Sequence, residues 1–236
     1  MDFSYMDQNL AAVREKIKAA CEKSGNPAPL LVAAVKYTDA AHIDYLTEKL
    51  GVLDLGENRV QQLLEHWDSI KREGVRFHFI GTLQSNKVKH IIDKVALIHS
   101  VDSLSLAKEI DRQAAKHGLC MDVLCEINSG REPNKSGVLP EDAPALCEAI
   151  ANFPHLRLRG FMTMAPHTEN PEDARKFFAE TFRQGLDIWQ KNLHNIDRPI
   201  FSMGMSESFP VAIEEGATII RVGRSLFRDP EADETK

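Results

Sequence analysis

Eight short apolar segments, separated by stretches of helical periodicity, constrain the fold of this chain more than any other feature. Each segment is rich in β-branched and other apolar residues and has the length of a buried strand. Strands that alternate with helices form parallel sheets, because each crossover returns the chain to the same end of the sheet. The segments are residues 30–37, 51–57, 76–81, 95–102, 121–128, 156–164, 199–205 and 217–224.

The stretches between these segments contain good helix formers and suitable boundary residues. Helices are expected within residues 58–73, 103–118, 139–153 and 171–193. The boundary residues are Asp102 or Ser103 as a cap, Pro140 and Pro171 in first turns, and Gly118 as a stop.

Eight strand–helix units with no Pro-, Gly- or Ser-rich linker predict an α/β fold, a single (β/α)8 TIM barrel. An open, doubly wound sheet is the alternative, because the pattern does not show closure. The whole chain, 1–236, is expected to be one domain. In it, residues 1–25 form an N-terminal helix and residues 229–236 a short polar tail.

The charge pattern argues against nucleic-acid and membrane partners. The formal net charge is −6 and no basic run occurs, so the electrostatic footprint that nucleic acid attracts is missing. The first 25 residues alternate charged and apolar positions, unlike a signal peptide or a membrane span. We therefore expect a cytoplasmic protein.

The cysteines and histidines form no disulfide or metal pattern. The chain has no Cys-x-x-Cys pair and none of the spaced histidine pairs typical of zinc sites. Free thiols in a reducing compartment and no metal site are expected. The cysteines are Cys21, Cys120, Cys125 and Cys147.

Active sites of such barrels lie at the carboxyl ends of the strands, so polar residues there are the candidates. They are rich in amides, hydroxyls and lysines. Glu57 and Glu126 close two strands and leave a glycosidase as one alternative, since their separation is not readable from sequence. The Gly-x-Ser-x-Gly elbow of serine hydrolases is absent.

The last two strand ends predict an anion site. In "RVGRS", Gly223 lets the backbone approach a ligand, and the N–H groups of residues 223–225 can face an anion. In "SMGMSES", Ser206 is expected to cap the following helix, with Ser202 and Gly204 beside it. Barrels commonly bind phosphate after strands seven and eight. The alternative is that both glycines only form tight turns.

Two cationic side chains, Arg221 and Lys36, each have two possible roles. Arg221 shares a strand face with Gly223, and a buried arginine needs an acceptor, which is either a ligand or a structural ion partner. Lys36 closes the first strand and either reaches solvent or pairs with a carboxylate. In a poorly hydrated setting, its amine would instead condense with an aldehyde. An amine opposite a phosphate cradle suits pyridoxal 5′-phosphate (PLP).

A set of motifs resembles one known family. "AAVKYTD", "GENRVQQ", "HFIGTLQSNKVK", "SVDS", "NKSG", "GFMTMAP", "SMGMSES" and "IIRVGRSLF" occur in that order. In order and spacing they are similar to the pyridoxal phosphate homeostasis proteins, the YggS/PROSC type. The resemblance covers residues 30–228.

This resemblance implies a barrel like the N-terminal domain of alanine racemase, with PLP held as a Schiff base on Lys36. It implies phosphate contacts around Gly223 and Arg224 with Ser202 nearby, and places Arg221 at the pyridine nitrogen. Asn58 and Lys135 match positions near the cofactor or the mouth. The family usually has Thr or Ser at the position of Arg224; the backbone contact does not depend on it, and Ser225 or the guanidinium can substitute.

Three functions remain open from the sequence. The first is a PLP carrier or homeostasis protein without turnover, since an arginine at the pyridine nitrogen makes the ring a poor electron sink. It would be a monomer that serves PLP-dependent apo-enzymes. The second is a racemase-like PLP enzyme that takes its base from a partner or from Lys135, because Tyr37 points to the other strand face. The third is a Schiff-base aldolase.

Overall fold

The strands close into one parallel barrel. The computed structural model describes residues 3–36, 38–71, 73–190 and 198–229. Each strand pairs with the next in sequence, and β1 pairs with β8. This confirms the predicted TIM barrel over the open sheet. The strands are β1 (Leu30–Ala34), β2 (Asp54–Glu57), β3 (Arg76–Phe79), β4 (Val95–Val101), β5 (Met121–Ile127), β6 (Leu156–Thr163), β7 (Ile200–Ser202) and β8 (Ile219–Val222).

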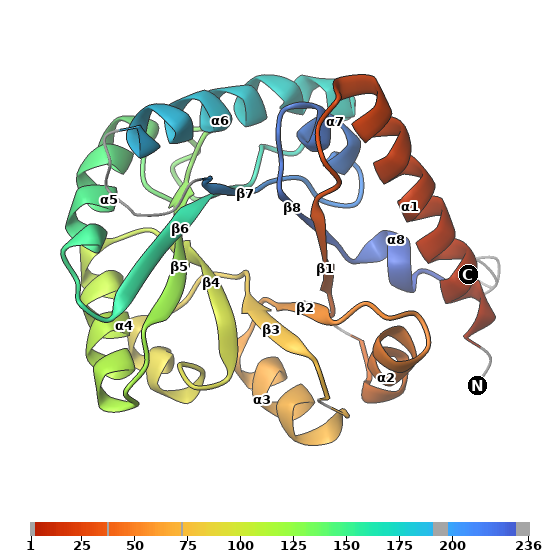
Figure 1. Ribbon diagram of the computed structural model, residues 1–236, viewed down its shortest axis with the longest axis horizontal. Helices are drawn as coiled ribbons and strands as arrows, with labels where there is room; N and C mark the ends of the chain where they lie inside the picture. Colours follow the sequence, from red (N-terminus) through yellow and green to blue (C-terminus); the bar gives the residue numbers. More distant parts are fainter. Residues whose placement is uncertain (1–2, 37, 72, 191–197, 230–236) are drawn as a thin grey trace.

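The helices lie outside the strands in Figure 1. Ser103 caps α4, as predicted, by accepting a hydrogen bond from the backbone N–H of Leu106. Pro140 and Pro171 begin short 3-10 turns rather than α-helices. The helices are α1 (Ser4–Ser24), α2 (Ala40–Glu48), α3 (Val60–Ser69), α4 (Leu104–Lys116), α5 (Ala143–Ala151), α6 (Arg175–Trp189), α7 (Phe209–Glu214) and α8 (Arg224–Phe227), with 3-10 turns η1 (Ser85–His90), η2 (Pro140–Asp142) and η3 (Pro171–Ala174). None of the helices in these ranges is long and apolar enough to cross a membrane.

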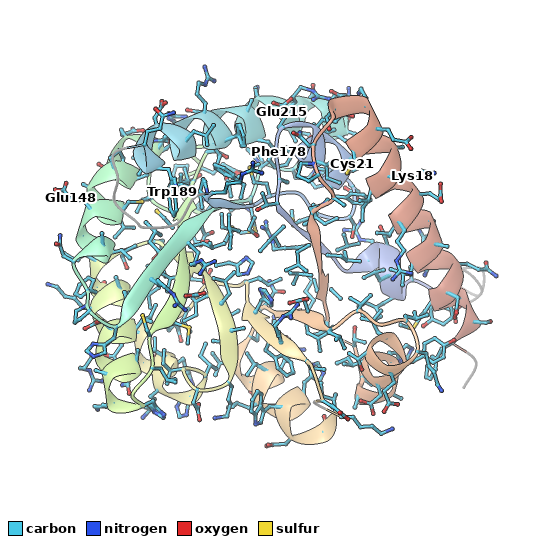
Figure 2. The ribbon with its side chains drawn as sticks, in the orientation of Figure 1. Lys18, Cys21, Glu148, Phe178, Trp189 and Glu215 are labelled. Atoms are coloured by element: carbon cyan, nitrogen blue, oxygen red, sulfur yellow. The ribbon has the colours of Figure 1, made fainter. Side chains whose placement is uncertain are left out.

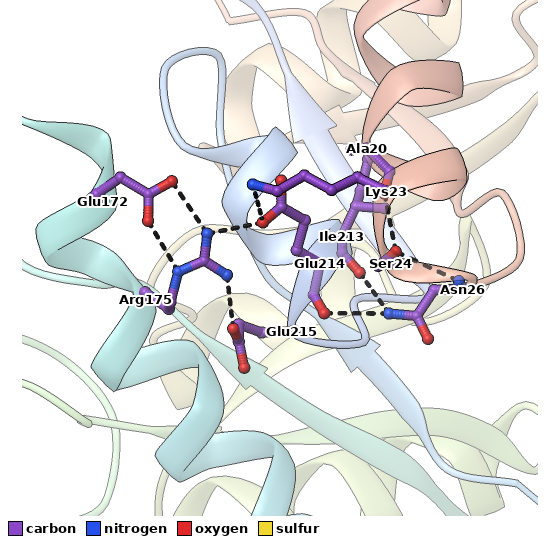
Figure 3. A network of polar contacts seen from close by, with 9 residues as sticks. All are labelled: Ala20, Lys23, Ser24, Asn26, Glu172, Arg175, Ile213, Glu214 and Glu215. Atoms are coloured by element: carbon purple, nitrogen blue, oxygen red, sulfur yellow. Dashed lines mark hydrogen bonds and ion pairs between the residues drawn. The ribbon is translucent and has the colours of Figure 1, made fainter.

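A polar network ties the first helix to the last units of the barrel (Figure 3). Lys23 of α1 donates to the carboxylate of Glu214 in α7 at 2.8 Å. Arg175 of α6 donates to the same carboxylate and to Glu215, both at 2.7 Å. Asn26 adds hydrogen bonds to the carbonyls that end α7. Single surface ion pairs contribute little, but this network joins both α1 and α6 to the end of α7.

Two apolar regions stabilise the barrel. The larger core lies between the sheet and the helices, where Phe178 of α6 is 1% exposed and points toward the strands (Figure 2). A smaller cluster is formed by Val32, Leu97, Leu124, Met162 and Ile219. These side chains come from β1, β4, β5, β6 and β8 and fill the interior of the barrel. The small inner cluster leaves room for buried polar side chains among the strands.

Candidate functional site

A cavity of about 320 Å³ lies at the carboxyl ends of the strands. Its lining comes from the ends of β1, β5 and β8 and from the segments after β1, β2, β3, β5, β6, β7 and β8, so the closed barrel brings together residues far apart in sequence. The predicted site residues that line it are Lys36, Asn58, Lys135, Arg221, Gly223 and Arg224. Of the residues that the family resemblance assigns to the cofactor site, Ser202 is not among the lining residues.

Arg221 is buried at the base of this cavity, 3% exposed. Its Nη1 donates to the carbonyl of Ser202 at 2.7 Å and to the Ser202 hydroxyl at 2.5 Å, and Nη2 donates to the carbonyl of Thr163 at 3.0 Å. Burial lowers the pKa of Arg221 to about 10, against the opposite effect of the Glu126 carboxylate. The guanidinium is therefore charged at neutral pH, and its remaining N–H groups are available to a ligand.

Lys36 lies two residues beyond the end of β1, and its side chain is exposed at the cavity. The expectation of a poorly hydrated lysine is therefore wrong: β1 ends at Ala34, before the chain reaches the lysine. No carboxylate of the described residues forms an ion pair with Lys36. Its amine is accessible to a ligand in the cavity. Tyr37 lies outside the described residues.

The strand-seven and strand-eight ends form a cradle of N–H groups. A Cβ on Gly223 would lie 2.9 Å from the carbonyl oxygen of Ala34, so only glycine fits here without displacing β1. The backbone N–H groups of Gly223 and Ser225 both face the hydroxyl of Ser206 at 3.4 Å. Ser206 does not cap α7 as predicted, because α7 begins at Phe209 and Ser208 precedes it.

Arg224 is exposed and does not reach into the cradle. Its Nη1 donates to the carboxylate of Glu207 at 2.6 Å. The guanidinium is therefore held on the exposed side of the cavity lining by Glu207. Of the two substitutes expected for a Thr or Ser side chain, Ser225 brings its backbone N–H to this place, whereas the Arg224 guanidinium is bonded to Glu207. The Ser206 hydroxyl, which the sequence did not suggest for this role, also lies here.

The two glutamates considered from sequence do not face one another across the cavity. Glu126 is a lining residue, whereas Glu57 is fully buried and its carboxylate is bonded to His66. A glycosidase requires both carboxylates on one substrate. The arrangement therefore does not support that alternative, and it leaves Glu126 as a cavity group whose role the sequence did not predict.

The cavity contains polar atoms that still lack partners. Ser136 donates to Oε1 of Glu126 at 2.7 Å, while Oε2 of Glu126 and Oδ1 of Asn58 are buried without a hydrogen-bond partner in the described part of the chain. Buried polar atoms are normally paired. Two open acceptors, a buried cation, an amine and an N–H cradle fit a flat polar ring that carries an aldehyde and a phosphate.

Glu126 makes stability depend on pH. Burial raises its pKa from 4.5 to about 7, with smaller effects from Ser136, Asp102 and Arg221. The folded protein then binds more protons than the unfolded chain between these values, so its free energy of unfolding falls as pH rises through this window. We expect Glu126→Gln to flatten that slope in urea unfolding. Glu148→Gln, on the outer side of α5 (Figure 2), is the control and should keep it.

A buried strut holds the loop that follows Lys36. His66 of α3 bonds through Nδ1 to Glu57 at the end of β2, and through Nε2 to the carbonyl of Thr38 at 2.9 Å. Both partners are acceptors, so both ring nitrogens donate and the ring is charged. The bond to Glu57 raises the pKa of His66. The strut fixes β2, α3 and the loop in one geometry.

Removing this strut should destabilise the protein most at low pH. His66→Ala is expected to lower the free energy of unfolding by about 1.5–3 kcal/mol, as for hydrogen bonds to charged groups. A raised histidine pKa stabilises below the unfolded pKa and is lost as pH rises through the folded one. The loss should therefore shrink at alkaline pH. His42→Ala, on the exposed Asp39 pair, is the control; an equal loss at every pH would contradict the charged strut.

Comparisons with known proteins agree with this architecture. Residues 8–230 match the family described as alanine racemase, N-terminal domain. A pyridoxal phosphate homeostasis protein of Aquifex aeolicus strain VF5 is 43% identical over 223 residues, 93% of this chain and 96% of that protein. One of Pseudomonas aeruginosa is 35% identical over 225 residues, 95% of each chain.

Solved structures share the barrel. PipY of Synechococcus elongatus PCC7942 with PLP bound has a TM-score of 0.80 at 29% identity, covering 94% of this chain and 100% of that one. Alanine racemase of Clostridium difficile 630 has the same fold, with a TM-score of 0.73 at 18% identity over 95% of this chain and 57% of that one. Fold and cavity thus define a barrel of the alanine racemase N-terminal type. The chain belongs to the family of pyridoxal phosphate homeostasis proteins.

Proposed function

We propose that this protein binds PLP and acts in its intracellular homeostasis, holding the cofactor covalently on Lys36. One observation carries the proposal: a single cavity joins an accessible amine to a buried guanidinium and an N–H cradle. Relatives bearing the homeostasis name and a PipY structure with PLP bound support it.

The chemistry requires only groups that line the cavity or, like the N–H of Ser225, are bonded to a lining residue. PLP bound here would supply an aldehyde to which a lysine amine can bond covalently, with the carbonyl oxygen released as water together with both amine protons. In our proposal Lys36 supplies that amine, the N–H groups of Gly223 and Ser225 with the Ser206 hydroxyl bind the phosphate, and Arg221 donates to the ring nitrogen. Asn58, whose Oδ1 is buried, and the exposed Lys135 line the same cavity.

The charge of Arg221 favours a protein that holds PLP over an enzyme that turns over a substrate. It is charged at neutral pH and donates to acceptors at every hydrogen bond it makes. A ring nitrogen that accepts from it is left unprotonated, and an unprotonated ring stabilises a substrate carbanion poorly. We therefore propose that the protein protects or transfers PLP.

A racemase-like enzyme is the second candidate, because Lys135 lines the same cavity as Lys36 and is exposed. Incubation with L-amino acids in deuterated water separates the two candidates. The carrier proposal predicts no enzymatic exchange of the α-proton and no D-enantiomer, although PLP binds. Exchange of the α-proton at an enzymatic rate, abolished by Lys135→Ala, would contradict the carrier proposal and favour the racemase-like enzyme.

Delivery is a further part of the proposal. We propose that the protein is a cytoplasmic monomer that passes PLP to dependent apo-enzymes. The exposed mouth at Lys36 and Lys135 supports access from outside, and buried free thiols at Cys125 and Cys147 suit a reducing compartment. Light scattering tests the oligomeric state. Reactivation of an apo-enzyme by the PLP-loaded protein, faster than by released PLP, tests the transfer.

A further inference from the structure

A continuous chain of buried hydrogen bonds crosses the interior of the barrel. Asp54 Oδ1 lies 2.9 Å from His78 Nε2, and His78 Nδ1 lies 2.9 Å from His99 Nε2. His99 Nδ1 lies 2.9 Å from the Ser202 hydroxyl, which accepts from Arg221 at 2.5 Å. The five side chains are 0–4% exposed. They connect the first residue of β2 to the cation in the cavity.

The direction of every bond in this chain follows from its cationic end. Arg221 only donates, so the Ser202 oxygen accepts from it. Among the residues that the structure describes, the Ser202 proton has one acceptor, His99 Nδ1. His99 then carries its proton on Nε2 and donates to His78 Nδ1. His78 likewise carries its proton on Nε2 and donates to the carboxylate of Asp54.

The opposite direction is costly. If His99 donated to Ser202, the buried hydroxyl proton would have no acceptor. His78 would then have to donate to both neighbours and become a second cation in the barrel interior. Burial, with His78 and Arg221 nearby, lowers the pKa of His99 well below its usual value, in agreement with a neutral ring.

The other end of the chain is anchored by a surface arginine. Arg76 donates to both oxygens of Asp54, at 2.7 and 2.5 Å. Burial acts to raise the pKa of Asp54, but the bonds from His78 and Arg76 outweigh it and lower that pKa. Asp54 is therefore a carboxylate. The hydrogen-bond chain runs from the Arg221 cation to the Asp54 anion, and the dipoles of all its bonds point the same way. Aligned hydrogen bonds strengthen one another.

We propose that Asp54, His78 and His99 are positioning residues for the cofactor: their one-way chain locks Arg221 as the donor to the ring nitrogen of PLP. This inference rests on the proposed function of the cavity. The hydrogen-bond chain makes the Ser202 hydroxyl a stronger acceptor. This hydroxyl and the Thr163 carbonyl together hold the Arg221 guanidinium in one plane. The remaining N–H groups of Arg221 then keep a fixed aim into the cavity, and Ser202 acts through Arg221.

The first test needs no cofactor. Side-chain nitrogen NMR of the unloaded wild-type protein at neutral pH reports which ring nitrogen carries the proton. We expect the Nε2–H form at both His78 and His99. An Nδ1–H form at either position, or a charged His78, would overturn the one-way chain.

The second test measures PLP binding by Asp54→Asn, which keeps the shape and removes the anion. We expect affinity to fall about tenfold or more, as for the loss of a charged hydrogen-bond partner, with a shift of the absorption band. Asp122→Asn is the matched control, since Asp122 is the second residue of β5 and pairs with a surface arginine, Arg157, but has no hydrogen bond to His78 or His99. Wild-type affinity and spectrum in Asp54→Asn would overturn the positioning role.

The two tests separate this inference from the proposed function. A wild-type protein that takes up no PLP would contradict the function, and the NMR result would still decide the direction of the chain. Wild-type binding together with an unaltered Asp54→Asn variant would contradict the inference alone.

Discussion

Lys36→Ala should abolish covalent attachment of PLP. The amine of Lys36 is exposed in the cavity and free of carboxylate partners among the described residues, so its removal takes away the reacting group without disturbing a buried contact. We expect the absorption band of the lysine adduct to vanish and PLP to leave on gel filtration. Residual binding through the cradle and Arg221 should remain, weaker by about two orders of magnitude or more.

Lys135→Ala is the matched control for this prediction. Lys135 is also an exposed lysine on the rim of the same cavity, so nonspecific reaction of PLP with surface amines affects both variants alike. The band should persist in Lys135→Ala. If the absorption band persisted in Lys36→Ala, or were lost only in Lys135→Ala, the covalent bond would lie at another lysine. Either result would contradict the assignment to Lys36.

Gly223→Val should separate binding of the phosphate from binding of the ring. Even a Cβ would lie 2.9 Å from the Ala34 carbonyl oxygen and 3.2 Å from the Ala34 Cβ, so valine must displace β1 or close the cradle. The N–H groups of residues 223 and 225 would then lose their aim at the anion. Charged hydrogen bonds contribute about 1.5–3 kcal/mol each, so PLP affinity should fall about a hundredfold.

The comparison with pyridoxal, which has no phosphate, makes this prediction specific. Titrations followed by absorbance should show a much smaller loss for pyridoxal than for PLP. Gly118→Ala serves as the control: its Cβ would meet no atom within 4 Å, so only backbone strain at its φ of +64° changes. Equal losses for both ligands in Gly223→Val would indicate general misfolding and not a phosphate cradle.

The sequence could predict the barrel because each strand is encoded by one short, continuous apolar run. Apolar runs of the right length recur along the whole chain, and each contains one strand of the structure. Barrel geometry then places strand ends together, which is why Lys36 and Gly223 could be related although they lie at opposite ends of the chain. Closure does not follow from the apolar pattern, because it depends on the pairing of β1 with β8.

The sequence could not predict contacts that depend on the shape of the closed barrel. The chain from Asp54 through His78 and His99 joins three separate strands, and no spacing within one segment reveals it. The hydration of Lys36 depends on where β1 ends. The role of Ser206 depends on α7 starting later than its helical pattern indicates. Each of these is decided by packing between elements.

Trapping the bound cofactor tests the central claim most directly. Reduction of the PLP-loaded protein with borohydride converts a lysine adduct into a stable amine, which peptide mass mapping can locate. We expect one pyridoxyl label, on the peptide that contains Lys36, and none after Lys36→Ala. A label on Lys135 or on another lysine, with Lys36 unmodified, would contradict the proposal that this cavity holds PLP through Lys36.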